Sequence, residues 1–228
     1  MQAQDTTTLF LLKLWPWVET NKNRLIAGAA IAVLAIFTIW FVACQREAKA
    51  VAAGEALTQA AIATAGPSAD AYLKVAGQYS GTVAGQRAQL QAAAAFFAAG
   101  KLTAAQAQFQ KYLDAHPDGE FAGQAQLGVA SSLDAQGKTD LAVGAYQKVV
   151  SNVSDAAVVN AAKFGLARIE EARGRVNDAL VHYQDVARAE PSSSLGSEAA
   201  MHLTELRSKL PAATPAPAQA APSLKPGQ

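Results

Sequence analysis

Residues 137–150 read GKTDLAVGAYQKVV: a glycine, an alanine five residues on, an aromatic residue four further on, and then two aliphatic residues. The pattern returns as GKLTAAQAQFQKYL from Gly100 and as GRVNDALVHYQDVA from Gly174, so successive units begin 37 residues apart. A weaker copy lies one period earlier in SADAYLKVAGQY, with Ser68 in the place of the alanine and Tyr72 in the place of the aromatic residue. A fixed period of this size indicates stacked helical repeats.

The residues ahead of each unit repeat as well. A small residue stands twelve positions before each alanine of the pattern, at Ala56, Ala93, Ala130 and Ala167. This spacing, with its apolar neighbours, is typical of one stripe of an α-helix. Each repeat is therefore expected to consist of a helix A, a turn at the glycine and a helix B. The small residues let helix axes approach, and the aromatic residue fills the gap between neighbouring pairs. The predicted fold is an all-α solenoid.

Helix boundaries follow from the same pattern and from capping residues. Asp155 and Ser192 are expected to cap the helices that follow them, and Gly137 is expected to take a left-handed conformation at the end of its helix A. The last helix, with its polar face, is predicted to close the array. We expect helices at about 68–79, 83–98, 101–115, 121–136, 138–152, 156–173, 175–189 and 197–209.

The small–alanine–aromatic spacing, with a proline after helix B at Pro117 and Pro191, resembles the tetratricopeptide repeat. Two departures are visible: the period is 37 rather than the usual 34, and the tryptophan typical of early helix A is missing. The resemblance implies an interaction module in which helix A residues line a concave binding face.

Charge and motifs exclude several function classes. The chain from Gln45 onward carries 16 of the 19 Lys and Arg and 16 of the 18 Asp and Glu, so it has no net charge, and its lack of a basic patch predicts no nucleic-acid binding. No phosphate-binding or nucleophile motif and no metal-ligand spacing is present, so we expect no catalytic residue, cofactor, metal or small-molecule substrate. Glu170 and Glu171 are expected to lie on a solvated face, and His182 on a helix surface.

An uncharged run marks the N-terminal region. Residues 25–43 are 19 residues without a charge, long enough at 1.5 Å per residue to span about 30 Å of hydrocarbon. We predict a single transmembrane helix there, behind a leader at residues 1–24; a buried core helix, a cleaved signal, and packing of the leader on the repeats are the alternatives. The leader is slightly more basic than the far side, which favours a cytoplasmic N-terminus.

The two ends of the remaining chain differ in character. Cys44, the single cysteine, follows Phe41-Val-Ala at the end of the apolar run. It is a possible lipidation site, the alternative being an uncleaved anchor. Residues 45–210 form the predicted repeat domain, whose first segment is expected to be helical and to stop at Gly66-Pro67. Residues 211–228 are rich in proline and alanine and are predicted to be a disordered tail.

The combination of features resembles one bacterial family. It consists of a leader with the pattern W-x-E-x-N-K-x-R-L-I, one span, and an alanine-rich array that includes YLKVAGQYSGTVAGQRAQLQAA at 72–93. This is similar to the YfgM-like family, an ancillary subunit of the SecYEG translocon. The resemblance implies a single-pass inner-membrane protein, with its repeats in the periplasm and with the translocon, chaperones or exported chains as partners. The alternative is a lipoprotein-type factor of envelope assembly or division coordination.

Four polar residues of the predicted A helices are the candidate protein-binding residues. Gln89, Gln126, Lys163 and Arg168 recur near one position of the repeat. Because they are polar and mixed in charge, we expect weak and adaptable contacts rather than one deep apolar pocket. The alternative is that they are ordinary solvated positions.

Overall fold

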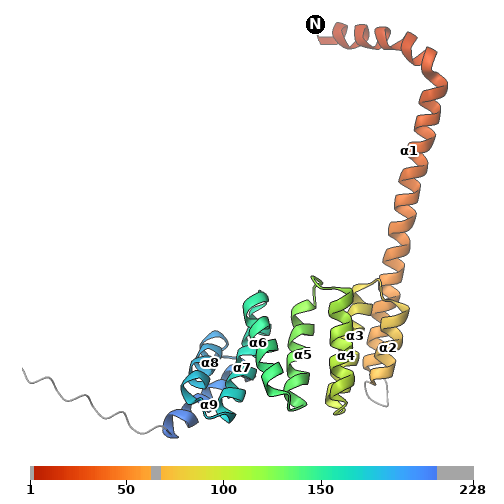
Figure 1. Cartoon of the computed structure of the whole chain (residues 1–228). Coiled ribbons are helices and arrows are strands. Elements are labelled where there is room, and N and C mark those ends of the chain that lie inside the picture. The colour runs from red at the N-terminus through yellow and green to blue at the C-terminus, as the bar shows by residue number, and fades with distance from the viewer. Residues whose placement is uncertain (1–2, 63–67, 210–228) are drawn as a thin grey trace, which may run out of the picture. The chain divides into compact units, whose positions relative to one another are not determined.

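The computed structural model describes residues 3–62 and 68–209, with side chains from Glu19 onward. These residues contain nine α-helices and no strand (Figure 1), so the all-α prediction is confirmed. The helices are α1 (Ala3–Ala61), α2 (Ala69–Gln78), α3 (Val83–Ala98), α4 (Leu102–Ala115), α5 (Ala122–Ala135), α6 (Thr139–Asn152), α7 (Ala156–Ala172), α8 (Val176–Ala189) and α9 (Ser194–Lys209). The predicted tail at 211–228 and the predicted stop at Gly66-Pro67 lie outside the described residues.

The packing divides the chain into two units. One is made of α1, most of α2 and the start of α3, and the other of Ser68–Ala71 and the chain from Gln89 onward. In the first unit, α1 runs through the uncharged run, through Cys44 and on to Ala61 without a break. Within the described residues, one stretch, Glu19–Ala61, is long and apolar enough to cross a membrane. Its large apolar side chains are exposed, Ile31 by 68% and Ile39 by 71%.

In the second unit, consecutive helices from α4 to α9 pack on one another in chain order (Figure 1). The A helices also contact each other, α5 with α7 and α7 with α9. The B helices α4 and α6 are not in contact with one another. Small residues at the helix crossings permit the close A–A packing, and the separation of α4 from α6 leaves a space above α5.

The turn glycines end the A helices by a common motif. Gly137 has a φ of +74°, its N–H donates to the Asp134 carbonyl at 2.8 Å, and the Lys138 N–H donates to the Leu133 carbonyl at 3.0 Å. These two bonds form a Schellman motif, which needs a left-handed residue that glycine adopts without strain. The same φ and the same pair of bonds recur at Gly100 and Gly174. The predicted conformation of Gly137 is confirmed.

Of the two predicted helix caps, one is confirmed and one is wrong. The Asp155 carboxylate accepts hydrogen bonds from the N–H groups of Ala157 (2.9 Å) and Val158, which confirms it as the cap of α7. The prediction for Ser192 is wrong, because Ser193 Oγ accepts from the Gly196 N–H at 2.9 Å. The last helix therefore begins at Ser194, three residues earlier than expected.

The aromatic residues pack as the repeat pattern predicts. Tyr146 is 4% exposed and lies in a core shared by α5, α6 and α7. A Cβ added to Gly165 would lie 2.5 Å from the Tyr146 ring, and one added to Gly128 would lie 2.6 Å from the Phe109 ring. In these two repeats the aromatic residue of helix B thus packs on a glycine 19 residues later, in the A helix of the next repeat.

Candidate polypeptide-binding groove

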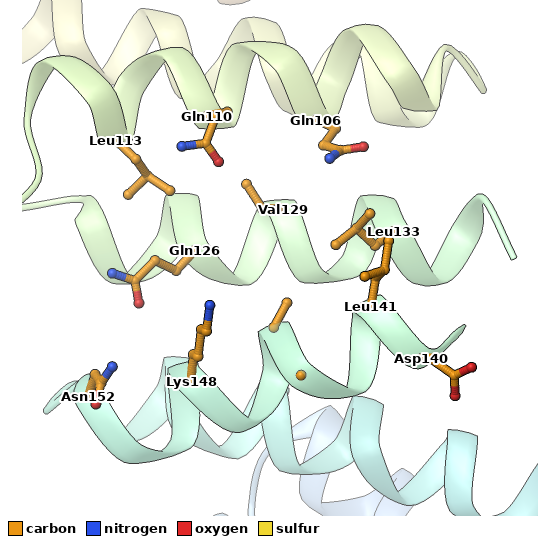
Figure 2. Close-up of a pocket in the computed structure, with 12 residues that line it drawn as sticks. Gln106, Gln110, Leu113, Gln126, Val129, Leu133, Asp140, Leu141, Lys148 and Asn152 are labelled. Atoms are coloured by element: carbon orange, nitrogen blue, oxygen red, sulfur yellow. The ribbon is translucent and has the colours of Figure 1, made fainter. Parts of the chain in front are cut away.

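A groove lies between α4 and α6, with α5 as its floor (Figure 2). Its volume is about 590 Å³, within the range of ordinary ligand sites. The floor and inner walls are apolar, and Leu133 and Leu141 point toward one another from α5 and α6 (Figure 2). Leu141 is 62% exposed, so it offers apolar surface that the fold does not use. The apolar lining consists of Leu113, Val129, Leu133, Leu141 and Ala145.

The groove is open because α6 carries small residues where it faces the space. Gly144 and Ala145 line it, and a Cβ added to Gly144 would meet no atom within 4 Å. One repeat later, 37 residues on, the same places are taken by Val181 and His182. At that repeat the ammonium of Lys163 on α7 also reaches the carboxylate of Asp185 on α8, at 2.7 Å. At the later repeat an ion pair therefore joins the A helix to its own B helix, at the positions that Gln126 and Lys148 hold in the groove.

The rim of the groove is polar and mostly uncharged. Gln106 and Gln110 on α4 and Gln126 on α5 supply side-chain amides, each able both to donate and to accept hydrogen bonds. Lys148 extends from α6 toward α5 (Figure 2). Asp140, at the other end of α6, is 2.6 Å from Arg173 and so is already paired. Such a lining suits a polypeptide, whose backbone presents donors and acceptors along its length.

A second hollow of about 490 Å³ adjoins the groove and shares Gln126 and Asn152 with it. It lies between the turn before α5 and the loop before α7. Three carboxylates line it, those of Asp118, Glu120 and Asp155, of which the last is occupied by the α7 cap. This end of the groove, which we call the acidic mouth (Asp118 and Glu120), therefore carries negative charge.

Two family models match the sequence. The model described as "Tetratricopeptide repeat-like domain" matches residues 16–143, more than half of the chain. The chain belongs to this family. A model described as "Tetratricopeptide repeat" matches residues 130–194. Together the matches cover the apolar stretch of α1 and the repeats that build the groove.

This tetratricopeptide repeat-like chain is similar to a solved structure from Podosopora anserina. That structure contains the nearly identical TPR-like repeats of a protein assigned as a kinesin light chain. It is 16% identical, with a TM-score of 0.48, and the match covers 72% of this chain and 85% of that one. No curated protein matches this chain.

The four predicted binding residues of the tetratricopeptide array do not gather at one place. Gln126 lines the groove and the adjoining hollow. Gln89 and Lys163 hold the same repeat position but turn to their own B helices: the Gln89 amide donates to the Gln108 carbonyl at 3.4 Å, and Lys163 pairs with Asp185. Arg168 lies five residues beyond Lys163, about 140° around the helix, and its guanidinium is 3.4 Å from the Asp134 carboxylate.

The residues that the sequence did not single out are mostly on helix B. Leu141, Gly144 and Lys148 on α6 form one wall of the groove, opposite Gln106 and Gln110 on α4. The signal that could have found them is the small residue at Gly144, where the next repeat has Val181. A smaller hollow of about 270 Å³ is lined by Phe97 and Leu127 of the A helices and by Phe109 of α4.

The last repeat of the tetratricopeptide array carries a polar cluster. The Tyr183 hydroxyl donates to a Glu171 carboxylate oxygen at 2.8 Å, and the His202 ring of α9 stacks on Tyr183 at 4.9 Å. Burial, and the bond to Glu171, raise the pKa of Tyr183 far above its usual range. The prediction of a solvated Glu170 is wrong: it is 9% exposed and lies 3.7 Å from His182, itself partly buried.

The side chains of this cluster join α9 to α7 and α8. In the earlier repeats the position that corresponds to His202 is a glycine. His202 stands 19 residues after Tyr183, the place that Gly165 holds relative to Tyr146. Ring stacking thus replaces the ring-on-glycine contact at the end of the array. Among the described residues no group of three or more His, Cys, Asp or Glu side chains is placed to hold a metal ion.

Proposed function

We propose that the chain is a membrane-anchored, non-enzymatic scaffold that binds polypeptide segments in the groove between α4 and α6. The observation that carries the proposal is the open apolar floor beneath an amide-rich rim, where Gly144 and Ala145 leave room. Repeats of this family are interaction modules, and the concave spaces of helical solenoids suit extended or helical chains. Of the predicted binding residues, Gln126 keeps its place in this proposal.

The anchor in this proposal is α1. Exposure of the apolar run at residues 25–43 to water is unfavourable, and its transfer into a bilayer would lower the free energy. The match to the repeat-like family begins at residue 16, so the apolar stretch and the repeats occur together in that family. We propose that residues 1–24 are a cytoplasmic leader and that residues 45–210 stand on the far side of the membrane, with 211–228 as a tail.

The resemblance to the YfgM-like family gives the finer proposal. In it the chain is an ancillary subunit of the translocon in the bacterial inner membrane, and its periplasmic repeats hold chaperones or exported chains. The alternative is a lipoprotein-type assembly or division factor lipidated at Cys44, which is exposed on α1. The intact mass of the membrane-extracted protein separates the two, because lipidation removes the leader and adds acyl mass.

The groove is tested by site-specific photocrosslinking in cells that make the full chain. A photoreactive amino acid replaces Leu141 in the groove and, as the matched control, Val181 on α8. Both side chains are exposed to a similar degree, 62% and 59%. The proposal predicts polypeptide adducts from position 141 and few from position 181. Equal yields at the two positions would show that the groove is not the binding site.

A further inference from the structure

The charges around the groove indicate the chemistry of its occupant. We infer that the groove binds a polypeptide segment in which a short apolar stretch is bordered at one end by basic residues. This inference rests on the proposed function, since it names the partner chemistry of that same groove.

The apolar part follows from the floor. Leu133 and Leu141 lie at one end, and Gln126 and Asn152 lie at the other (Figure 2). From Leu141 to Asn152 the helix rises about 16 Å, the length of about five residues of extended chain. The rim amides between these ends can bond to the backbone of that chain, whatever its sequence. The floor thus accommodates a stretch of about five residues with large aliphatic side chains on one face.

The basic part follows from the acidic mouth. Asp118 and Glu120 are exposed, and neither makes a hydrogen bond or ion pair within residues 3–62 and 68–209. Lys148 is the single basic residue among those that line the groove and the adjoining hollow. Two unpaired carboxylates therefore outweigh one ammonium where a bound segment leaves the apolar floor. Charge complementarity at such a rim favours a basic partner and excludes an acidic one.

The carboxyl-terminal residues of the chain itself match this chemistry less well. Residues 211–228 contain one leucine, Leu224, and one basic residue, Lys225, among proline and alanine. A run of alternating prolines offers little aliphatic surface to the floor. The favoured occupant is therefore a segment of another polypeptide.

The test measures the affinity of three synthetic peptides for the full chain in phosphatidylcholine nanodiscs, with empty nanodiscs as background. The peptides KRGLALALGKR, EDGLALALGED and KRGSASASGKR share a length and a symmetric design, so chain direction does not matter. We expect the first peptide to bind about fivefold more tightly than the second at low salt, the order expected of two or three exposed charge pairs. The difference should shrink as salt rises, and the third peptide should bind at least about tenfold more weakly than the first, for lack of apolar burial.

The double variant Asp118→Asn with Glu120→Gln supplies the matched control. It should remove the preference for the basic peptide and leave the affinity for the acidic peptide the same or higher. If the basic and acidic peptides bind the unmodified chain equally, the inference is overturned, but the groove remains a binding site. If neither apolar peptide binds above the empty nanodiscs, the proposed function fails as well. If deletion of residues 210–228 is needed before the basic peptide binds, the tail is the occupant and the inference is wrong.

Discussion

Replacing Gly165 with alanine should destabilise the array, although alanine is the better helix former. In most helix interiors the change from glycine to alanine stabilises by about 1 kcal/mol. At Gly165 the new Cβ would lie 2.5 Å from the Tyr146 ring, which is 4% exposed and donates its hydroxyl to Ser131. Overpacking of this kind costs about 1–3 kcal/mol. Since the gain in helix propensity offsets about 1 kcal/mol of this cost, we expect a net loss of up to about 2 kcal/mol.

The matched control is Gly144→Ala, where the new Cβ meets nothing within 4 Å. It should stabilise by up to about 1 kcal/mol. Thermal unfolding of the full chain in detergent, followed by circular dichroism at 222 nm, measures both. At about 2–4 °C per kcal/mol for a chain of this size, Gly165→Ala should lower the Tm by up to about 8 °C and Gly144→Ala should raise it.

A double variant identifies the ring as the cause. Tyr146→Ala alone should cost about 3–5 kcal/mol. With the ring removed, Gly165→Ala should become stabilising, so the two changes should couple by about 1–3 kcal/mol. If Gly165→Ala raises the Tm of the otherwise unmodified chain, the ring-on-glycine contact does not shape the interface between repeats.

Three further predictions concern the turns, the end of the array and the membrane. Gly137→Ala places a side chain at a φ of +74° and should cost about 1 kcal/mol or more; an unchanged Tm would contradict the Schellman assignment. Because the folded state raises the pKa of Tyr183 above its usual value near 10, its stabilising effect should persist below pH 10 and fall as the pH rises further. The melting temperature should therefore drop less steeply above pH 10 in Tyr183→Phe, and parallel curves would refute this. Cysteines introduced after residue 50 should react with an impermeant reagent on intact cells, whereas cysteines in the leader should be protected; the reverse result would invert the proposed orientation.

The local features of the fold could be predicted because they repeat at a fixed spacing. The period places Gly137 at a turn and Tyr146 in the core, and it sets the bounds of α5 within a residue at each end. The start of α9 was missed because two serines compete as caps. Gly196 lets the chain turn against the end of α8, so the helix begins near Ser193.

The groove could not be predicted in the same way, because it depends on pairs that are distant in sequence. Lys163 holds the same position of the repeat as Gln126. Only the structure shows that its ammonium forms an ion pair with Asp185 within the array. The sequence pair Glu170-Glu171 suggests a solvated face, but in the structure His182 of the next helix packs against Glu170. Which polar side chains remain unpaired and able to bind a partner therefore depends on the packing of the whole array and not on any one helix.

The central claim is that polypeptides bind where Gly144 leaves the groove open. The most direct measurement is the yield of photocrosslinked adducts from position 141 when Gly144 is replaced by valine, the residue found one repeat later. The matched control is Gly54→Val, in a helix where a new Cβ also meets nothing within 4 Å. The account predicts that Gly144→Val abolishes the adducts while Gly54→Val preserves them. Adducts that persist undiminished in a correctly folded Gly144→Val protein would contradict it.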